Sequence, residues 1–106
     1  MTSNSSRRPY DLVLYGATGY QGKLIAQYLS ANAPPSLKWA ISGRNHLKLQ
    51  DLSQFLHEEY PDRARPGVVV ASLVRSDLDQ MVAQTQLVLN TAGVSVINPF
   101  ELLFLT

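Results

Sequence analysis

Strand-like and helix-like segments alternate strictly along this chain of 106 residues. The strand-like segments are short apolar runs of the kind that form buried parallel strands, and they cover 10–15, 37–42, 67–71 and 86–91. The helix-like segments between them cover 23–30, 45–60 and 76–82. This alternation requires a parallel sheet with right-handed crossovers. We therefore predict an α/β fold, an incomplete Rossmann-type doubly wound parallel sheet with about four strands in the order 3-2-1-4 and three helices.

The period of the helix-like segments predicts which side chains face the sheet. In the first two helices these are the apolar side chains Leu24, Ile25, Tyr28, Leu29, Leu49, Leu52, Phe55 and Leu56. Asn45 is the predicted N-cap of the second helix, because its side chain can accept a hydrogen bond from a first-turn N–H. Ser76 and Asp79 have the spacing of a capping box, which predicts the start of the third helix.

The chain has the length of a single domain. We expect a flexible N-terminal tail over 1–9, the first part of a nucleotide-binding domain over 10–93, and an apolar C-terminal tail over 94–106. The second half of a doubly wound sheet is missing, so the fourth strand has an open edge. Either the apolar tail covers this edge, or a second copy of the chain pairs with it in a homo-oligomer.

Composition and charge exclude several classes of protein. The formal charge is +1, too small for the electrostatic attraction on which nucleic-acid binding depends. The chain has no cysteine, which excludes disulfides, thiol catalysis and cysteine-bound zinc, and His46 and His57 lack a third metal ligand at a suitable spacing. No apolar run approaches the ~20 residues of a membrane-spanning helix, and no secretory signal is present. We expect a cytoplasmic protein without a metal.

The segment from Gly16 to Gly22 follows the first strand and opens the first helix, with glycines at 16, 19 and 22. This spacing is a variant of the dinucleotide-binding fingerprint. Gly16 allows the tight turn, Gly19 lets the backbone approach a pyrophosphate, and Gly22 lets the helix pack closely on the sheet. The intervening residues complete the predicted cofactor site and can add donors: Ala17, Thr18, Tyr20 and Gln21.

The residues after the second strand predict which dinucleotide binds. An NAD site has an acidic residue here for the ribose 2′-hydroxyl, but no Asp or Glu occurs between Lys38 and Gln50. Arg44 occurs instead, and its planar guanidinium suits a 2′-phosphate. We predict NADP(H) as the cofactor, with Ser42 and Asn45 as further hydrogen-bonding partners.

The end of the fourth strand, Asn90-Thr91-Ala92-Gly93, lies at the edge where ligands bind in open α/β sheets. We predict that Asn90, Thr91 and Gly93 line the ribose and nicotinamide of the cofactor. A plain turn at the strand end is an equally good interpretation. No residue of the chain is a convincing proton donor for hydride chemistry.

The stretches YDLVLYGATGYQGKLIAQYL, WAISGRNHLKL and LVLNTAG, between Tyr10 and Gly93, resemble the N-terminal NADP-binding part of the saccharopine dehydrogenase-like oxidoreductases, a group that includes trans-acting enoyl reductases. The resemblance implies a Rossmann domain, NADP(H) and an oxidoreductase role. For some members it implies lipid or glycolipid metabolism and a place on lipid droplets or membrane surfaces, which is the alternative to a cytoplasmic location.

The chain departs from that group after Gly93. Its members usually continue with Gly-Pro-aromatic and a long substrate domain, whereas Val94 to Pro99 follow here and the sequence ends at Thr106. We therefore expect a truncated oxidoreductase that holds the cofactor and lacks the substrate domain. The alternative is a non-catalytic dinucleotide-binding or redox-sensor module of the NmrA-like type. A semialdehyde or acyl-phosphate reductase has a similar glycine loop but needs a catalytic cysteine, which this chain lacks.

Overall fold

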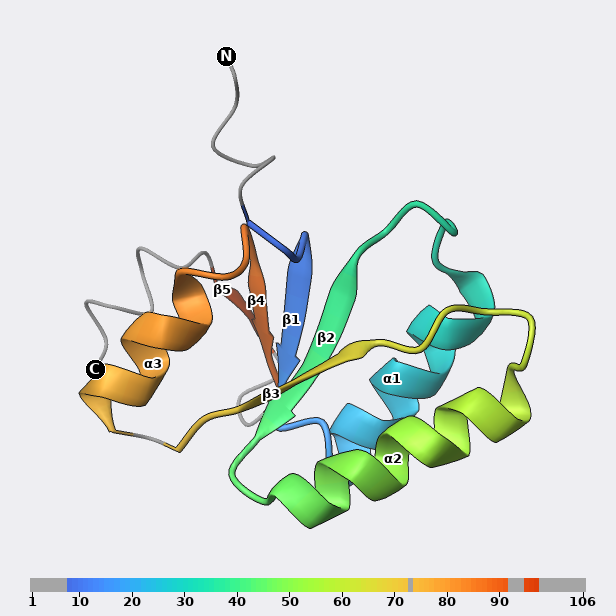
Figure 1. The fold of residues 1–106 in the computed structure, drawn as a ribbon, viewed down its shortest axis with the longest axis horizontal. Helices are drawn as coiled ribbons and strands as arrows, with labels where there is room; N and C mark the ends of the chain where they lie inside the picture. The colour runs from blue at the N-terminus through green and yellow to red at the C-terminus, as the bar shows by residue number, and fades with distance from the viewer. Residues whose placement is uncertain (1–7, 73, 92–94, 98–106) are drawn as a thin grey trace.

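The computed structural model describes residues 8–72, 74–91 and 95–97, and it contains one sheet of five strands in the order β3-β2-β1-β4-β5 (Figure 1). The strands are β1 Leu12–Tyr15, β2 Trp39–Gly43, β3 Gly67–Val70, β4 Val88–Asn90 and β5 Ser95–Ile97. Strands β1 to β4 are parallel, with β1 between β2 and β4. The predicted order 3-2-1-4 is confirmed.

The outer edge of β4 is paired within the chain. Strand β5 runs antiparallel to β4, with Val88 opposite Ile97 and Asn90 opposite Ser95. The first residues after the predicted domain therefore cover the edge that the sequence leaves open. The rest of the apolar tail, residues 98–106, lies outside the described residues.

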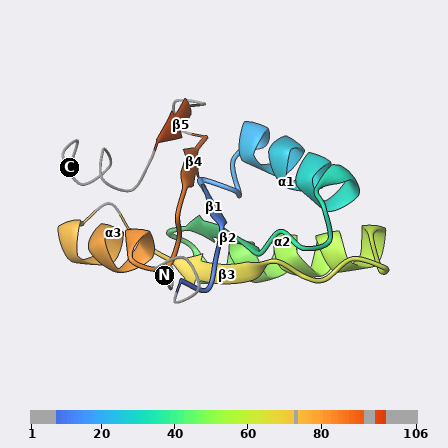
Figure 2. The ribbon, with the colours of Figure 1, turned by 90° about the horizontal axis from the view of Figure 1, so that it is seen from above.

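Three helices cover the two faces of the sheet: α1 Tyr20–Asn32, α2 His46–Glu59 and α3 Arg75–Val82. Figure 2 shows α1 and α2 on one face and α3 on the other. Side chains of β1 alternate between the two layers, as a strand buried on both faces requires. Val13 and Tyr15 pack with Leu78 of α3, whereas Leu14 packs with Leu49 of α2. None of the described helices is both long and apolar enough to cross a bilayer.

The inward face of α1 differs from the prediction. The residues Gly22, Ala26 and Ser30 are buried, whereas Leu24 and Tyr28 are 50% and 65% exposed. The small residues recur every four positions and bring the helix close to the sheet, which turns the larger Leu24 and Tyr28 toward solvent. Ile25 and Leu29 are partly buried, as predicted.

For α2 and α3, some predictions about caps and buried side chains are confirmed and others are wrong. Asn45 is the N-cap of α2, and Leu49, Leu52 and Leu56 are buried as predicted. Phe55 is 40% exposed, because Ser53 takes the inward position beside Leu52. The predicted capping box of α3 does not form.

Helix α3 begins at Arg75, with Val74 as its N-cap. Asp79 pairs with Arg75 one turn away instead of bonding to the helix start. Asp77 supplies the carboxylate of the first turn, and it accepts hydrogen bonds from the amide and hydroxyl of Ser72.

Candidate functional site

The glycine turn joins β1 to α1 at the carboxyl edge of the sheet, which is the lower edge in Figure 1. Gly16 has φ 80°, in the left-handed region that favours glycine. The amides of Gly16 and Ala17 donate to the Ser42 carbonyl at 2.9 and 3.1 Å, and the Gly19 amide donates to the Gly16 carbonyl at 3.1 Å. The first two bonds fasten the turn to the end of β2, and the third closes the turn on itself.

The three glycines of the turn differ in whether the fold requires a glycine at that position, and for what reason. Gly16 needs its positive φ. A Cβ on Gly22 would lie 2.7 Å from the Ala17 Cα and closer still to the Gly16 carbonyl oxygen, so the backbone contact excludes any side chain. A Cβ on Gly19 would lie 3.4 Å from that oxygen, and Gly19 is extended, with φ −75° and ψ 172°. The fold itself thus requires glycine at 16 and 22 but tolerates a small side chain at 19.

The N-terminus of α1 is left open beside Gly19. The amide of Lys23 donates to the Gly19 carbonyl at 2.9 Å, which is the first bond of the helical ladder. The N–H groups of Tyr20, Gln21 and Gly22 precede that bond and have no acceptor in the helix. Gly19, the N-cap, has no side chain to offer them, and the first turn contains no acidic residue. The positive end of the helix dipole therefore faces an exposed position with free donors.

The end of β2 places Arg44 beside this turn. A Cβ on the preceding Gly43 would lie 4.0 Å from the Thr18 hydroxyl, so the two segments are neighbours. Arg44 is exposed, and among the residues with described positions the one ion pair joins Arg75 and Asp79. The guanidinium of Arg44 is thus without a carboxylate partner in that part of the chain.

The charges of Arg44 and Asp77 both act on Tyr15, which is not among the site residues predicted from the sequence. Burial raises the pKa of the Tyr15 phenol, the Arg44 charge opposes that rise, and the Asp77 charge adds to it. The phenol donates to the Ala71 carbonyl at 3.3 Å. Side chains alternate between the two faces along β1, which predicts that Tyr15 packs on the same face as Val13, against α3. The sequence gives no other sign of a role for Tyr15.

Ser42 and Asn45 flank Arg44 but have different surroundings. Ser42 is fully buried, and its hydroxyl donates to the Val69 carbonyl at 2.6 Å. Asn45 is exposed, and its Oδ1 accepts from the Lys48 amide at 3.0 Å. The Ser42 hydroxyl is therefore committed to the sheet, whereas the amide nitrogen of Asn45 remains at the surface.

The end of β4 meets the glycine turn from the other side. Asn90 pairs with Tyr15 in the strand register. Thr91 follows, and its hydroxyl donates to the carbonyls of Tyr15 and Gly16 at 2.8 and 2.9 Å. Gly93 lies outside the described residues. Asn90, Thr91 and the turn are thus brought together at one edge, as predicted from their places at strand ends.

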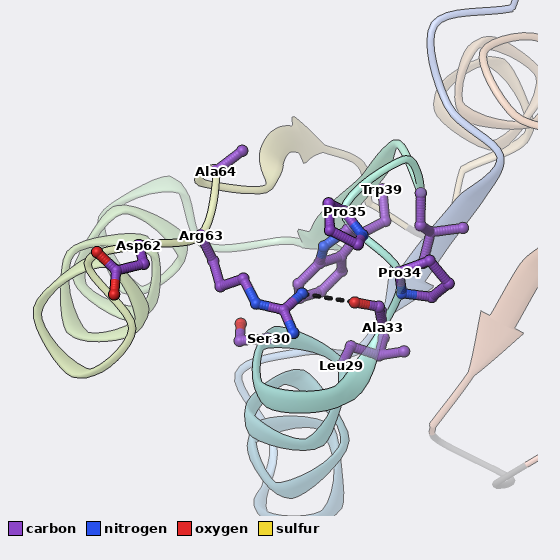
Figure 3. Close-up of a pocket in the computed structure, with 10 residues that line it drawn as sticks. Leu29, Ser30, Ala33, Pro34, Pro35, Trp39, Asp62, Arg63 and Ala64 are labelled. Atoms are coloured by element: carbon purple, nitrogen blue, oxygen red, sulfur yellow. Dashed lines mark hydrogen bonds between the residues drawn. The ribbon is translucent and has the colours of Figure 1, made fainter.

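Two cavities differ in their distance from this edge: one lies at the opposite end of the sheet, and the other lies beside the edge, lined in part by Lys23 of α1 and Lys48 of α2. One of about 280 Å³ is at the amino end of β2, between Trp39, Pro35 and Arg63 (Figure 3). The guanidinium of Arg63 donates to the carbonyls of Ala33 and Ala31 at the C-terminus of α1. A second cavity of about 320 Å³ separates α1 from α2. Among the described residues, no group of three acidic or histidine side chains could hold a metal ion.

Comparison with known proteins gives relatives that are named as oxidoreductases. The chain is 36% identical to a trans-acting enoyl reductase of Mycobacterium leprae over 82% of its length, and 34% identical to that of Mycobacterium bovis over 83%. It is 31% identical to a saccharopine dehydrogenase-like oxidoreductase of Mus musculus over 84% of its length. The chain is a homologue of these oxidoreductases.

The similarity covers a small part of each relative. The matched segment spans 20% of the two mycobacterial proteins and 23% of the mouse protein. No protein-family model matches the chain, and no solved structure matches it. The relatives and the parallel sheet independently agree with the resemblance seen in the glycine turn and in the strands that flank it.

Proposed function

We propose that this chain binds NADP(H), with the cofactor pyrophosphate on the N-terminus of α1. The observation that carries the proposal is the open position at Gly19. The fold does not require glycine there, and the helix N–H groups beside it have no cap. A pyrophosphate supplies the missing acceptors and the negative charge that the helix dipole favours, and it needs a residue without a side chain to come close. The residues present therefore fit the cofactor.

The 2′-phosphate is assigned to Arg44. Arg44 is exposed, follows the strand end that adjoins the turn and has no carboxylate partner within the described chain. The surface amide of Asn45 can donate to the same phosphate. The hydroxyl of Ser42 is left out of the proposal because it donates to Val69 inside the sheet. An NAD-specific site would instead place an acidic side chain here to bind the ribose 2′-hydroxyl.

The reaction class follows from the relatives and from the cofactor. NADPH supplies a hydride, and the relatives include enoyl reductases, so we assign the chain to an oxidoreductase that reduces a carbon–carbon or carbon–nitrogen double bond. This chain's part is to hold the cofactor at the carboxyl edge of its sheet. The end of β4, at Asn90 and Thr91, lies on the side of the turn where the nicotinamide half would extend.

A non-catalytic sensor is the second candidate. The observation that favours it is that Tyr15, the buried titratable group at this edge, already donates its phenol to Ala71. Its pKa is raised by burial, so it stays protonated but is not directed at a substrate. Steady-state oxidation of NADPH with enoyl substrates separates the two: turnover supports the enzyme, and binding without turnover supports the sensor.

The cofactor assignment is tested by titrating the chain with NADPH and with NADH. We expect a preference for NADPH, and we expect Arg44→Ala to weaken NADPH by about 1.5–3 kcal/mol, the range for a lost charged hydrogen bond, while leaving NADH unchanged. Arg65→Ala is the matched control, because it removes the same charge from a residue that bonds to Ser53 and Gln54 away from the turn. Equal affinity of the unmodified chain for both cofactors would remove the role of Arg44.

A further inference from the structure

Thr91 has a hydrogen-bonding pattern that joins two distant strand ends. Its hydroxyl lies 2.8 Å from the Tyr15 carbonyl oxygen and 2.9 Å from that of Gly16, 75 positions away in the sequence. Its amide also donates to the Tyr15 carbonyl at 3.0 Å. The residue is 9% exposed. Its polar atoms thus point into the protein, toward the start of the glycine turn.

The Gly16 carbonyl is held from three directions. The Thr91 hydroxyl and the Gly19 amide both donate to its oxygen, and the Cα of Gly22 packs against it so closely that no Cβ fits between them. A threonine hydroxyl has one proton, so it shares that proton between the carbonyls of Tyr15 and Gly16. The three contacts fix the direction of one peptide plane, between Gly16 and Ala17, at the start of the turn.

This peptide plane needs an external restraint. Gly16 has φ 80°, and a glycine can move between distinct backbone conformations at little cost. Rotation of the plane would redirect the Gly16 carbonyl and the Ala17 amide, which bonds to Ser42. The path of the loop to Gly19 would change with them. A binding seat made of backbone N–H groups is effective only when those groups are held in place beforehand.

We propose that Thr91 is a positioning residue for the pyrophosphate seat, acting through the Gly16 carbonyl and not by contact with the cofactor. This proposal rests on the proposed function, since it concerns the same NADP(H) site. It replaces the prediction that Thr91 lines the ribose and nicotinamide. Its single proton goes to backbone carbonyls, so the hydroxyl has no proton to offer a ligand.

Three probes separate positioning from direct contact in Thr91→Val. NADPH occupies every part of the site, adenosine 2′-phosphate 5′-diphosphate lacks the nicotinamide half, and adenosine 2′-monophosphate also lacks the pyrophosphate. We expect Thr91→Val to weaken the first two about tenfold, the range for lost neutral hydrogen bonds, and to leave the third unchanged. Thr91→Ser keeps the hydroxyl and should bind all three as the unmodified chain does.

Each other outcome of these titrations overturns the proposal. A loss for NADPH alone would show direct contact with the nicotinamide half. An equal loss for all three probes would show a general disturbance of the fold, and no loss in a folded Thr91→Val protein would show that the hydroxyl is dispensable. Failure of the proposed function looks different, because the unmodified chain would then bind none of the probes.

If Thr91→Val does not fold, hydrogen exchange on the unmodified chain tests whether the Gly16 carbonyl is held in place. The Gly19 amide donates to the clamped carbonyl, whereas those of Tyr20 and Gln21 precede the helical ladder. We expect the Gly19 amide to exchange more than about tenfold slower than its two neighbours. Exchange of all three at one rate would show a turn that is not held.

Discussion

Helices α1 and α2 start at the same edge of the same sheet, but only one of the two starts is completed by the protein. Helix α2 begins after Asn45, whose side chain accepts from the Lys48 amide at 3.0 Å. Helix α1 begins after Gly19, which has no side chain to accept anything. Neither first turn contains an acidic residue. In the proposed function, an external anion completes the start of α1.

The two ends of α1 show the same contrast. At its C-terminus, the guanidinium of Arg63 donates to the carbonyl of Ala33, 30 positions earlier in the chain (Figure 3), and also to that of Ala31. That contact satisfies the orphan carbonyls and suits the negative end of the dipole. The protein therefore caps the end of α1 that lies far from the glycine turn and leaves the end at the turn uncapped.

The largest expected effect comes from making the α1 start resemble the α2 start. In Gly19→Asp, the new carboxylate caps the helix and occupies the pyrophosphate seat with a like charge. We expect the free energy of unfolding to rise by about 0.5 kcal/mol and NADPH affinity to fall at least ~100-fold. Urea denaturation and calorimetric titration measure the two changes.

Gly19→Ala is the matched control, since it adds a methyl group without charge. It should leave stability nearly unchanged, because a Cβ at this position meets only an ordinary contact of 3.4 Å, and it should still weaken NADPH. If the Gly19→Asp protein bound NADPH as tightly as the unmodified chain, the pyrophosphate would not bind at the N-terminus of α1.

A smaller effect is expected from undoing the cap of α2. Asn45→Ala removes the acceptor for the Lys48 amide, which should cost about 1 kcal/mol of stability by urea denaturation. NADH affinity should not change, because the proposed pyrophosphate site at the N-terminus of α1 is unaltered. Lys48→Ala is the control, since only its backbone N–H takes part in the cap. Equal losses in both variants would contradict this account of the α2 start.

The smallest effect concerns the start of α3 and depends on pH. The amide and hydroxyl of Ser72 donate to Asp77 and hold the pKa of its carboxyl below its ordinary value of 3.8. A carboxyl with a lowered folded-state pKa stabilises the protein above 3.8 and loses that contribution as the pH falls through the folded-state pKa. The melting-temperature difference between the unmodified chain and Asp77→Asn should shrink over that acidic window. A melting-temperature difference that stays constant over this pH range would contradict the role given to Asp77.

Local patterns in the sequence predict most of the fold. The strand order 3-2-1-4, the N-cap at Asn45 and the buried Leu49, Leu52 and Leu56 all follow from periodicity and from the alternation of elements. The inward face of α1 does not, because periodicity favours the bulkier Leu24 and Tyr28 over Ala26 and Ser30. Only the close contact of Gly22 with the turn selects the small residues, and that contact exists only in the folded chain.

The candidate site divides in the same way. Sequence spacing locates the glycine turn, Arg44 and the end of β4, and the structure brings all three to one edge. Spacing alone does not separate Ser42, whose hydroxyl is buried against Val69, from the exposed Asn45 three positions later. It also cannot show that the Arg44 charge acts on Tyr15, because that interaction depends on the pairing of β1 with β2.

The sequence by itself determined the order of the strands, the place of the glycine turn and the lack of an Asp or Glu between Lys38 and Gln50, because local patterns of residues carry all three. Only the tertiary structure decided which glycines the fold requires, and that Thr91 restrains Gly16 from 75 positions away. The physical reason is that both depend on backbone groups of separate strands meeting at one edge of the sheet, and those contacts form only when β1 is packed between β2 and β4.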